Sequence, residues 1–287
     1  MKDKTFLVIG ATGQLGSEFQ NKLSGRGLYY VAPKREEYDF TNFMQMRELI
    51  NRVRPAVIIN CAAYNLVDEA EAKSELAYMV NSNAVRNLAE LCKENNIFLV
   101  HYSTDYVFDG KKQALYTEDD EPNPLNIYGK SKLEGEQIVR DHLSEFLLFR
   151  LSWVMGKGKQ NFLYKFLNWA EKRRVLKISC DEVSVPTYTE DIVNVTLLSL
   201  ERGLNGLYHL TNSGYASRYE LARYLVLKLG LENLVIPVPM KFFKARAKRP
   251  LFTCMSNKKI SKELGISIPT WEDGIDRIVQ ILEKNVA

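Results

Sequence analysis

Short apolar runs alternate with longer amphipathic stretches through the first half of the chain. Apolar runs that end at a glycine or a polar residue indicate strands with both faces buried, and apolar residues three and four apart indicate helices. The predicted strands are 5–9, 25–32 (a turn leading into the strand), 56–60, 97–102 and 146–151. The predicted helices are 14–23, 43–54, 69–94 and 130–142. This alternation predicts an α/β fold, a Rossmann-type doubly wound parallel sheet covered by helices on both faces.

The pattern becomes less regular after Trp153. The helices predicted there are 162–174, 190–202, 219–229 and 271–284, with one strand at 206–211. We expect one domain over 1–153, with a segment near 180–205 returning to it, and a smaller C-terminal α/β lobe formed mainly by 154–287. Ligands of a doubly wound sheet bind at the carboxyl ends of the strands, where the strand order reverses. The lobe is therefore expected to pack over that edge.

Composition and charge exclude several classes of protein. Of the 287 residues, 46% are hydrophobic and 26% charged, as in an ordinary soluble globular protein. The net charge is only +4 and the basic residues are spread along the chain, so no nucleic-acid surface is expected. The four cysteines share no close spacing and predict neither a zinc cluster nor a disulfide framework. No apolar run approaches the roughly 18 residues of a membrane span, and we expect a cytoplasmic protein without membrane contacts.

A glycine tract follows the first predicted strand and opens the first predicted helix. The tract is Gly10-Ala11-Thr12-Gly13-Gln14-Leu15-Gly16, with the spacing G-x-x-G-x-x-G. Glycines permit a tight turn and let the backbone and the helix N-terminus approach a pyrophosphate. We expect Gly10 to end the strand, Gly13 to lie nearest the phosphates and Gly16 to let the helix pack on the strand. Gln14 and Leu15 are assigned to the same cofactor site. The alternative is a glycine-rich turn without a ligand.

The end of the second predicted strand selects between dinucleotide cofactors. An acidic residue there binds the adenosine ribose hydroxyls, whereas cations hold a 2′-phosphate. Lys34 and Arg35 stand at this point and favour NADPH over NADH, the alternative being two solvated loop cations. Asp39 is placed to contact the adenine edge or to cap the helix that follows, and Phe40 is assigned to the cofactor site beside it.

Three side chains suited to proton delivery surround the fourth predicted strand and the helix after it. Thr104 is expected just after the strand, and Tyr128 and Lys132 are four residues apart on one helix face. A free tyrosine has a pKa of about 10, and a nearby ammonium lowers it. Lys132 could also bind the nicotinamide ribose, while the Thr104 hydroxyl polarises a substrate carbonyl. Tyr-x-x-x-Lys alone is frequent by chance, but in this order after the glycine tract it indicates nicotinamide-dependent carbonyl reduction.

Longer tracts carry a resemblance to a known family. They are NCAAY at 60–64, Val67-Asp68, STDYVFDG at 103–110, PLNIYGKSKLEGE at 124–136, RLSWV at 150–154, PTY at 186–188, GLYHL at 206–210 and Arg249-Pro250. With them the chain resembles the extended short-chain dehydrogenase/reductases, and among these the dTDP-4-dehydrorhamnose reductase family. The resemblance covers nearly the whole length.

This resemblance implies roles for individual residues. Thr104, Tyr128 and Lys132 would be the catalytic set. Ala62, Ala63 and Tyr64 would line the cofactor cleft beyond the third strand. The residues that would face the sugar are Val67, Asp105, Tyr106 and Trp153, with Trp153 alternatively a core aromatic. Asn161 and Arg249 are weaker candidates for the nucleotide-sugar end, and Arg249 is alternatively a surface arginine.

The implied reaction is NADPH-dependent reduction of the 4-keto group of dTDP-4-dehydro-L-rhamnose, or of a close relative, to give dTDP-L-rhamnose. The implied partner is a sugar nucleotide, and a homodimer is expected. Family members commonly carry a Gln and a Gly before Pro-Thr, where this chain has 181–185 of different sequence. Some members hold a divalent cation such as Mg²⁺, for which Glu18, Glu190 and Asp191 are the acidic candidates, with plain helix caps as the alternative.

Two other functions are considered. A nucleotide-sugar 4,6-dehydratase or epimerase is disfavoured, because dehydratases typically follow this threonine with an Asp-Glu pair and here Asp105 is followed by Tyr106. A non-catalytic relative, such as the regulatory subunit of methionine adenosyltransferase, is disfavoured by the complete set of Thr104, Tyr128 and Lys132.

Overall fold

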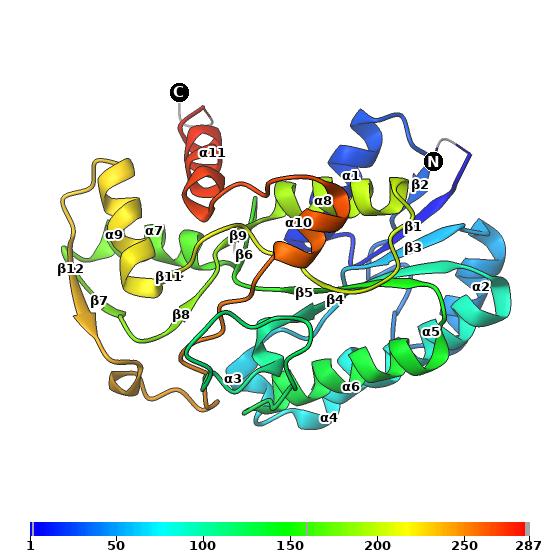
Figure 1. The fold of residues 1–287 in the computed structure, drawn as a ribbon, viewed down its shortest axis with the longest axis horizontal. Helices are drawn as coiled ribbons and strands as arrows, with labels where there is room; N and C mark the ends of the chain where they lie inside the picture. Colours follow the sequence, from blue (N-terminus) through cyan, green and yellow to red (C-terminus); the bar gives the residue numbers. More distant parts are fainter. Residues whose placement is uncertain (2, 159, 285–287) are drawn as a thin grey trace.

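Six parallel strands form the central sheet, in the order β10-β5-β4-β3-β1-β2 (Figure 1). The computed structural model describes residues 1, 3–158 and 160–284. The strands are β1 (Phe6–Ile9), β2 (Tyr30–Val31), β3 (Val57–Asn60), β4 (Phe98–Thr104), β5 (Phe146–Leu151) and β10 (Gly206–His209). The order reverses at β1, whose two neighbours are β2 and β3, so the carboxyl ends of β1 and β3 form the expected ligand edge.

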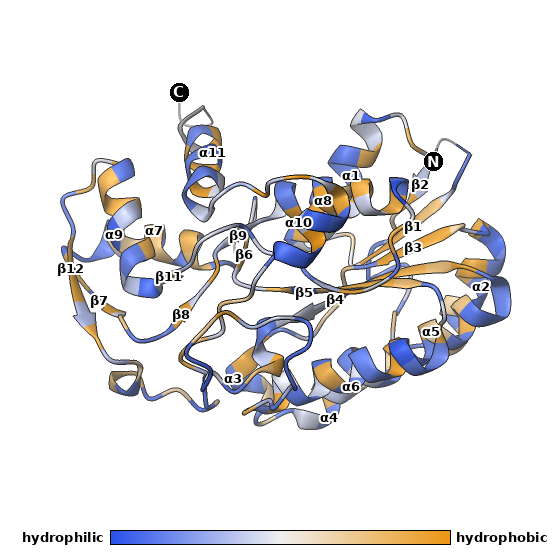
Figure 2. Cartoon of the chain, in the orientation of Figure 1, coloured by the Kyte–Doolittle hydropathy of each residue, from blue (hydrophilic) through white to orange (hydrophobic). Residues whose placement is uncertain are grey.

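Alternate residues of each strand join hydrophobic cores on opposite faces of the sheet. Phe6 and Val8 pack under α1 (Gln14–Gly25), α8 (Thr189–Glu201) and α10 (Lys258–Leu264). Leu7 and Ile9 pack under α2 (Phe43–Val53), α5 (Ala84–Asn95) and α6 (Ile127–His142). Figure 2 shows the strands as strongly hydrophobic and the covering helices as mixed in hydropathy, as a sheet buried on both faces requires. The predicted doubly wound α/β fold is confirmed.

The predicted helix over 69–94 is wrong as a single element. The chain forms α3 (Val67–Ala70), α4 (Ser74–Tyr78), a π-helical turn η1 (Met79–Asn83) and then α5. Asn81 in η1 is fully buried and hydrogen bonds to both the N–H and the C=O of Tyr64. Gly135 of α6 packs against the same turn, since a Cβ there would lie 2.3 Å from the Asn81 carbonyl oxygen. These contacts, which are distant in sequence, accompany the interruption of the regular helix.

A second group of elements forms the smaller lobe, at the left of Figure 1. Its core joins α7 (Phe162–Lys172), α9 (Arg218–Lys228) and α11 (Trp271–Lys284) to β7 (Val175–Ser179), which pairs in parallel with β12 (Leu234–Val238). Two short pairings complete it: β6 (Val154–Met155) with β9 (Thr187–Tyr188), and β8 (Val183–Ser184) with β11 (Ala216–Ser217). Short 3₁₀ turns lie at η2 (Asp105–Val107) and η3 (Met240–Phe242). Within the described chain, no helix has the length and apolarity to cross a membrane.

Several element boundaries differ from the predicted ones. Helix α6 begins three residues before the predicted start, because Asn126 caps it by accepting the Gly129 N–H at 2.8 Å. Strand β4 runs through Thr104, which therefore ends the strand instead of following it. The sequence pattern did not indicate β7, β12 or α10, nor the two-residue strands of the lobe.

Candidate active site

The glycine tract forms a tight turn between β1 and α1. Gly10 adopts a φ of +79°, and a Cβ there would lie 2.7 Å from the backbone nitrogen of Ala62. A Cβ on Gly16 would lie 2.3 Å from the Gly10 carbonyl oxygen, so only glycine permits this approach of helix and strand. Gly13 is the N-cap of α1 and makes no side-chain capping bond. The first N–H groups of α1, beginning at Gln14, are therefore left to bind an anion such as a pyrophosphate.

Two buried asparagines shape the loop that follows β3 beside the glycine turn. The Asn60 Oδ1 accepts the Ala62 N–H at 3.1 Å, and Asn81 holds the backbone of Tyr64 from the other side. Ala63 between them is exposed and Leu15 of α1 is buried. The sequence carries no signal for Asn81, because nothing in a helical pattern distinguishes an amide that bonds to a distant segment of backbone.

The predicted adenine-side residues lie in the loop after β2. Lys34 and Arg35 are both exposed, and Phe40 packs against the core under α2. Asp39 Oδ1 accepts the N–H and the hydroxyl of Thr41, and these bonds lower the pKa of the carboxyl. Asp39 is not the cap of the helix that follows, because the N-cap of α2 is Asn42, which accepts the Gln45 N–H.

Tight packing of α6 on η2 brings Tyr128 to the end of β4. A Cβ on Gly129 would lie 2.3 Å from the Tyr106 carbonyl oxygen, so this glycine sets the approach. The rings of Tyr128 and Tyr106 meet edge to face with centroids 5.9 Å apart. Burial raises the pKa of Tyr128 to about 12, and hydrogen bonding to Thr104 opposes that rise. Thr104 and Tyr128 therefore meet at the carboxyl edge of the sheet.

Lys132 lies on the same face of α6 but does not contact the phenol as expected. Its side chain is 1% exposed and Nζ donates to the Tyr102 carbonyl oxygen at 2.6 Å. Burial lowers the pKa of Lys132 to about 8, against a smaller opposing effect of Glu136. The expected lowering of the Tyr128 pKa by this ammonium is not seen, because burial raises that pKa and the opposing influence is the hydrogen bond to Thr104.

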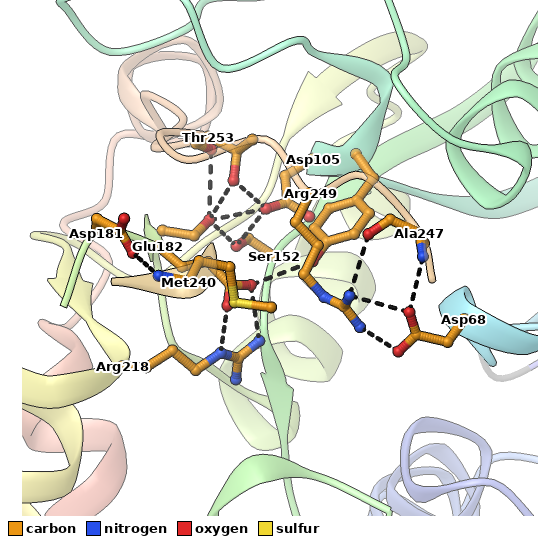
Figure 3. A network of polar contacts seen from close by, with 12 residues as sticks. Asp68, Asp105, Ser152, Asp181, Glu182, Arg218, Met240, Ala247, Arg249 and Thr253 are labelled. Carbon is orange, nitrogen blue, oxygen red and sulfur yellow. Dashed lines mark hydrogen bonds and ion pairs between the residues drawn. The ribbon is translucent and has the colours of Figure 1, made fainter. Parts of the chain in front are cut away.

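Asp105 points into a network of polar contacts that the sequence did not indicate (Figure 3). Tyr106 joins this network through its hydroxyl. Asp105 is buried among hydroxyl groups from three other segments. The Tyr106 hydroxyl donates to Glu182 Oε1 at 3.2 Å, and the guanidinium of Arg218 reaches the two Glu182 oxygens at 3.4 Å. Burial and the Glu182 charge raise the pKa of Tyr106 well above its ordinary value.

Trp153 lies under Arg218 and has an unusual backbone. The Arg218 guanidinium carbon is 3.8 Å from the centroid of the indole ring, and φ of Trp153 is +33°. A positive φ is strained for a bulky residue and is found more often at functional sites than elsewhere. The ring packs against the core of the smaller lobe but is not fully buried. Its position is therefore consistent with both predicted roles, a residue that faces the sugar and a core aromatic.

Arg249 forms an ion pair with a carboxylate of α3. Its guanidinium donates to both oxygens of Asp68, at 3.1 and 2.6 Å, and Asp68 follows Val67 at the start of α3. Figure 3 shows Arg249 bonded to Asp68 and Ala247, and Arg218 bonded separately to Glu182. Arg249 is therefore a held, partly buried cation, and not a free surface arginine.

Asn161 contacts the phosphate loop. Its Oδ1 caps α7 by accepting the Tyr164 N–H, and its Nδ2 donates to the side chain of Gln14 at 3.1 Å. Gln14 in turn donates to the Val154 carbonyl oxygen at 3.0 Å. These contacts join the glycine turn to the smaller lobe, and the role of Asn161 toward a nucleotide sugar stays a prediction.

The suggested Mg²⁺ site is not supported. Over the described residues, no group of three or more His, Cys, Asp or Glu side chains is arranged to hold a metal ion. Glu190 pairs with Lys22 and Arg277, and Asp191 pairs with Arg277 at 2.6 Å. Glu18 lies beside Glu190, and burial raises the pKa of Glu18. Two side-chain cations thus occupy the place beside these carboxylates.

A cradle for a dinucleotide and a tyrosine–lysine pair share one edge of this parallel sheet, an arrangement that defines the extended short-chain dehydrogenase/reductase class. The chain belongs to the RmlD substrate binding domain family, whose model matches residues 4–284. The dTDP-4-dehydrorhamnose reductase of Salmonella typhimurium is 35% identical over 288 residues, 95% of this chain and 96% of that protein. The dTDP-4-keto-6-deoxy-D-glucose reductase of Streptomyces niveus is 35% identical over 98% of both chains.

A solved structure extends the likeness to three dimensions. The dTDP-4-dehydrorhamnose reductase of Bacillus anthracis, crystallised in complex with NADP, has a TM-score of 0.93 and 33% identity, covering 97% of this chain and 99% of that one. The family and the fold that the sequence indicated are confirmed.

Proposed function

We propose that this chain reduces the 4-keto group of dTDP-4-dehydro-L-rhamnose with NADPH to give dTDP-L-rhamnose, a step in sugar-nucleotide synthesis for surface polysaccharide. The observation that carries the proposal is that Thr104 and Tyr128 meet at the sheet edge where the glycine turn lies, with Lys132 on the same helix face as Tyr128. The relatives named for this reaction, and the NADP complex of one of them, support the substrate and the cofactor.

Each side chain has a role in moving or holding a proton. Bound NADPH supplies the hydride for C4 of the sugar. Tyr128 gives its proton to the oxygen that becomes an alkoxide, and Thr104 hydrogen bonds to the phenol. Lys132 holds its charge in a buried position on the same helix face, where it would hydrogen bond to the nicotinamide ribose.

The decisive test is turnover of a panel of dTDP-4-keto-6-deoxy sugars with NADPH, with the products identified by NMR. Tyr128→Phe should lower kcat by about 10²–10⁴-fold, the usual contribution of a general acid. The dissociation constant for NADPH should stay within about twofold of that of the unaltered chain. Tyr208→Phe removes a hydroxyl from the edge strand β10 and serves as the matched control. Near-normal turnover by Tyr128→Phe would contradict the assignment.

Cofactor preference is tested at Lys34 and Arg35. Both lie exposed after β2, where a 2′-phosphate would be held. Replacing both by Glu should weaken NADPH binding much more than NADH binding, because repulsion acts only on the extra phosphate. Fluorescence titration of both cofactors measures this difference. Equal losses would mean that the pair does not select the cofactor.

A second candidate is reduction of a related dTDP-4-keto-6-deoxy sugar with a different configuration. It is favoured by the Streptomyces niveus relative, which is as similar to the chain as the Salmonella typhimurium enzyme. The same product analysis separates the two, since the configuration of the reduced sugar identifies the reaction.

The domain organisation belongs to this proposal. We assign 1–153 to NADPH and 154–287 mainly to the sugar nucleotide, with 180–205 returning to the first domain. The packing of α8 on the sheet beside α1 supports the return, and strand β10 at the edge of the sheet continues the returning segment to His209. The homodimer and the cytoplasmic location stay predictions.

A further inference from the structure

Asp105 is a buried carboxylate that directly follows Thr104. Asp105 is 3% exposed. Within the described chain, no Lys, Arg or His forms an ion pair with this carboxylate. A carboxylate withdrawn from water without a cation needs several hydrogen bonds to remain ionised. The arrangement of its donors therefore determines what Asp105 can do for its neighbour.

Three hydroxyl groups converge on one oxygen of this carboxylate. Oδ2 lies 2.5 Å from Thr253 Oγ1, 2.8 Å from Ser184 Oγ and 3.2 Å from Ser152 Oγ (Figure 3). Ser152 is also 2.5 Å from Ser184 and accepts the Val185 N–H. The donors come from the end of β5, from β8 and from the segment after Arg249, so the smaller lobe reaches the end of β4 through them.

The other oxygen is held more weakly. Oδ1 accepts the hydroxyl of Thr104 at 3.2 Å, and the Thr104 oxygen accepts the Tyr106 N–H at 3.2 Å. A hydroxyl has one proton. While Thr104 donates to Asp105 it cannot donate to a substrate carbonyl or to a Tyr128 phenolate, so any such donation requires the bond to Asp105 to break.

We propose that Asp105, fixed by Thr253 and Ser184, is a positioning residue that holds the Thr104 proton while Tyr128 is neutral and releases it to the Tyr128 oxygen when the phenol has given up its proton. This inference rests on the proposed reduction. Only the hydrogen bond of Thr104 moves, and its O–H bond stays intact. Asp105 can lose the hydrogen bond from Thr104 because the two short hydrogen bonds from Thr253 and Ser184 to its Oδ2 remain.

The kinetic test uses a double-mutant cycle between Thr253 and Thr104. Thr253→Val removes the hydroxyl at constant shape, so Asp105 should retain the Thr104 proton and kcat should fall about tenfold, the worth of one hydrogen bond to a charged group. KM for NADPH should change less than twofold, and Thr253→Ser should restore kcat. In the Thr104→Val background the Thr253→Val change should have no further effect on kcat. An undiminished tenfold loss in that background, or an equal loss in Thr253→Ser, would overturn the proposal.

A second readout needs no substrate. Burial raises the pKa of Asp105 and the Thr253 bond opposes this, so Thr253→Val raises the pKa further. A raised carboxyl pKa removes stability as the pH rises, and Thr253→Val should therefore destabilise the protein more at pH 8 than at pH 4. The titratable groups that interact with Asp105 are Tyr106, Tyr128 and Cys254, all of which burial keeps neutral in this range.

Asp105→Asn provides the matched background. There, the effect of Thr253→Val on the free energy of unfolding should be the same at both pH values. A pH-independent effect in the unaltered chain would overturn the inference, because Asp105 would then carry no charge for the hydroxyls to hold. Failure of every sugar nucleotide to turn over, with the pH dependence intact, would instead overturn the proposed function.

Discussion

Lys132→Met should abolish turnover and yet stabilise the ligand-free protein at neutral pH. Lys132 is 1% exposed, and burial lowers its pKa from the ordinary 10.5 to about 8. Since a tenfold change in proton affinity is about 1.4 kcal/mol, keeping this charge in the folded chain costs about 3 kcal/mol at pH 7. Methionine fills a similar volume without a charge.

The direction in which stability changes with pH follows from the number of protons that the folded and unfolded chains bind. Between pH 8 and 10.5 the unfolded chain holds a proton on this lysine that the folded chain has lost, so the stability of the unaltered protein rises with pH. From pH 7 to pH 9.5 this gain is about 2 kcal/mol, and Lys132→Met should lack it. Changes in packing are independent of pH and cancel from the comparison.

Urea unfolding at pH 7 and pH 9.5 measures the difference. Lys130→Met, two residues earlier on α6 and exposed, is the matched control and should leave the pH dependence unchanged. A difference in unfolding free energy between Lys132→Met and the unaltered chain that is the same at both pH values would refute the reasoning. Turnover assays of the same variants should show loss only for Lys132→Met.

Three other changes test the fold that positions the site. Glu136→Gln leaves the fully buried Arg150 without its 2.7 Å partner and should lower the unfolding free energy by about 3–5 kcal/mol in urea. Gly16→Ala should weaken NADPH binding in a fluorescence titration, because its Cβ meets the Gly10 backbone, whereas Gly25→Ala, where a Cβ meets nothing within 4 Å, should leave binding unchanged. Asn42→Ala removes the cap of α2 and should lower the thermal unfolding midpoint, at a cost of about 1 kcal/mol.

The central sheet was predictable because its strands are buried on both faces. The run 146–151 is apolar except for Arg150 and predicts a strand, and β5 has those bounds. The lobe gave weaker signals, since β7 alternates exposed and buried residues over only five positions and its partner β12 contains Pro237. Two-residue strands carry no period, so pairings such as β8 with β11 arise only from tertiary contacts.

Some residues of the candidate site could likewise be predicted from the sequence, and others could not. Glycines and the Tyr-x-x-x-Lys spacing are local signals, and the structure places them at one sheet edge. Asn81, Glu182, Arg218 and Thr253 carry no such signal, because their roles depend on neighbours far away in sequence. The predicted lowering of the Tyr128 pKa by Lys132 is not seen, because sequence spacing does not specify burial. Burial raises the pKa of Tyr128 and lowers the pKa of Lys132.

The sequence by itself determined the doubly wound sheet, the glycine turn and the residue types for proton delivery, since each depends on local periodicity or on conformations that few residues allow. Only the tertiary structure decided that Lys132 binds the Tyr102 carbonyl, that hydroxyls from the smaller lobe enclose Asp105, and that Arg277 lies among the carboxylates proposed for a metal. These features depend on burial and on distances between segments far apart in the chain, and such distances exist only once the chain has folded.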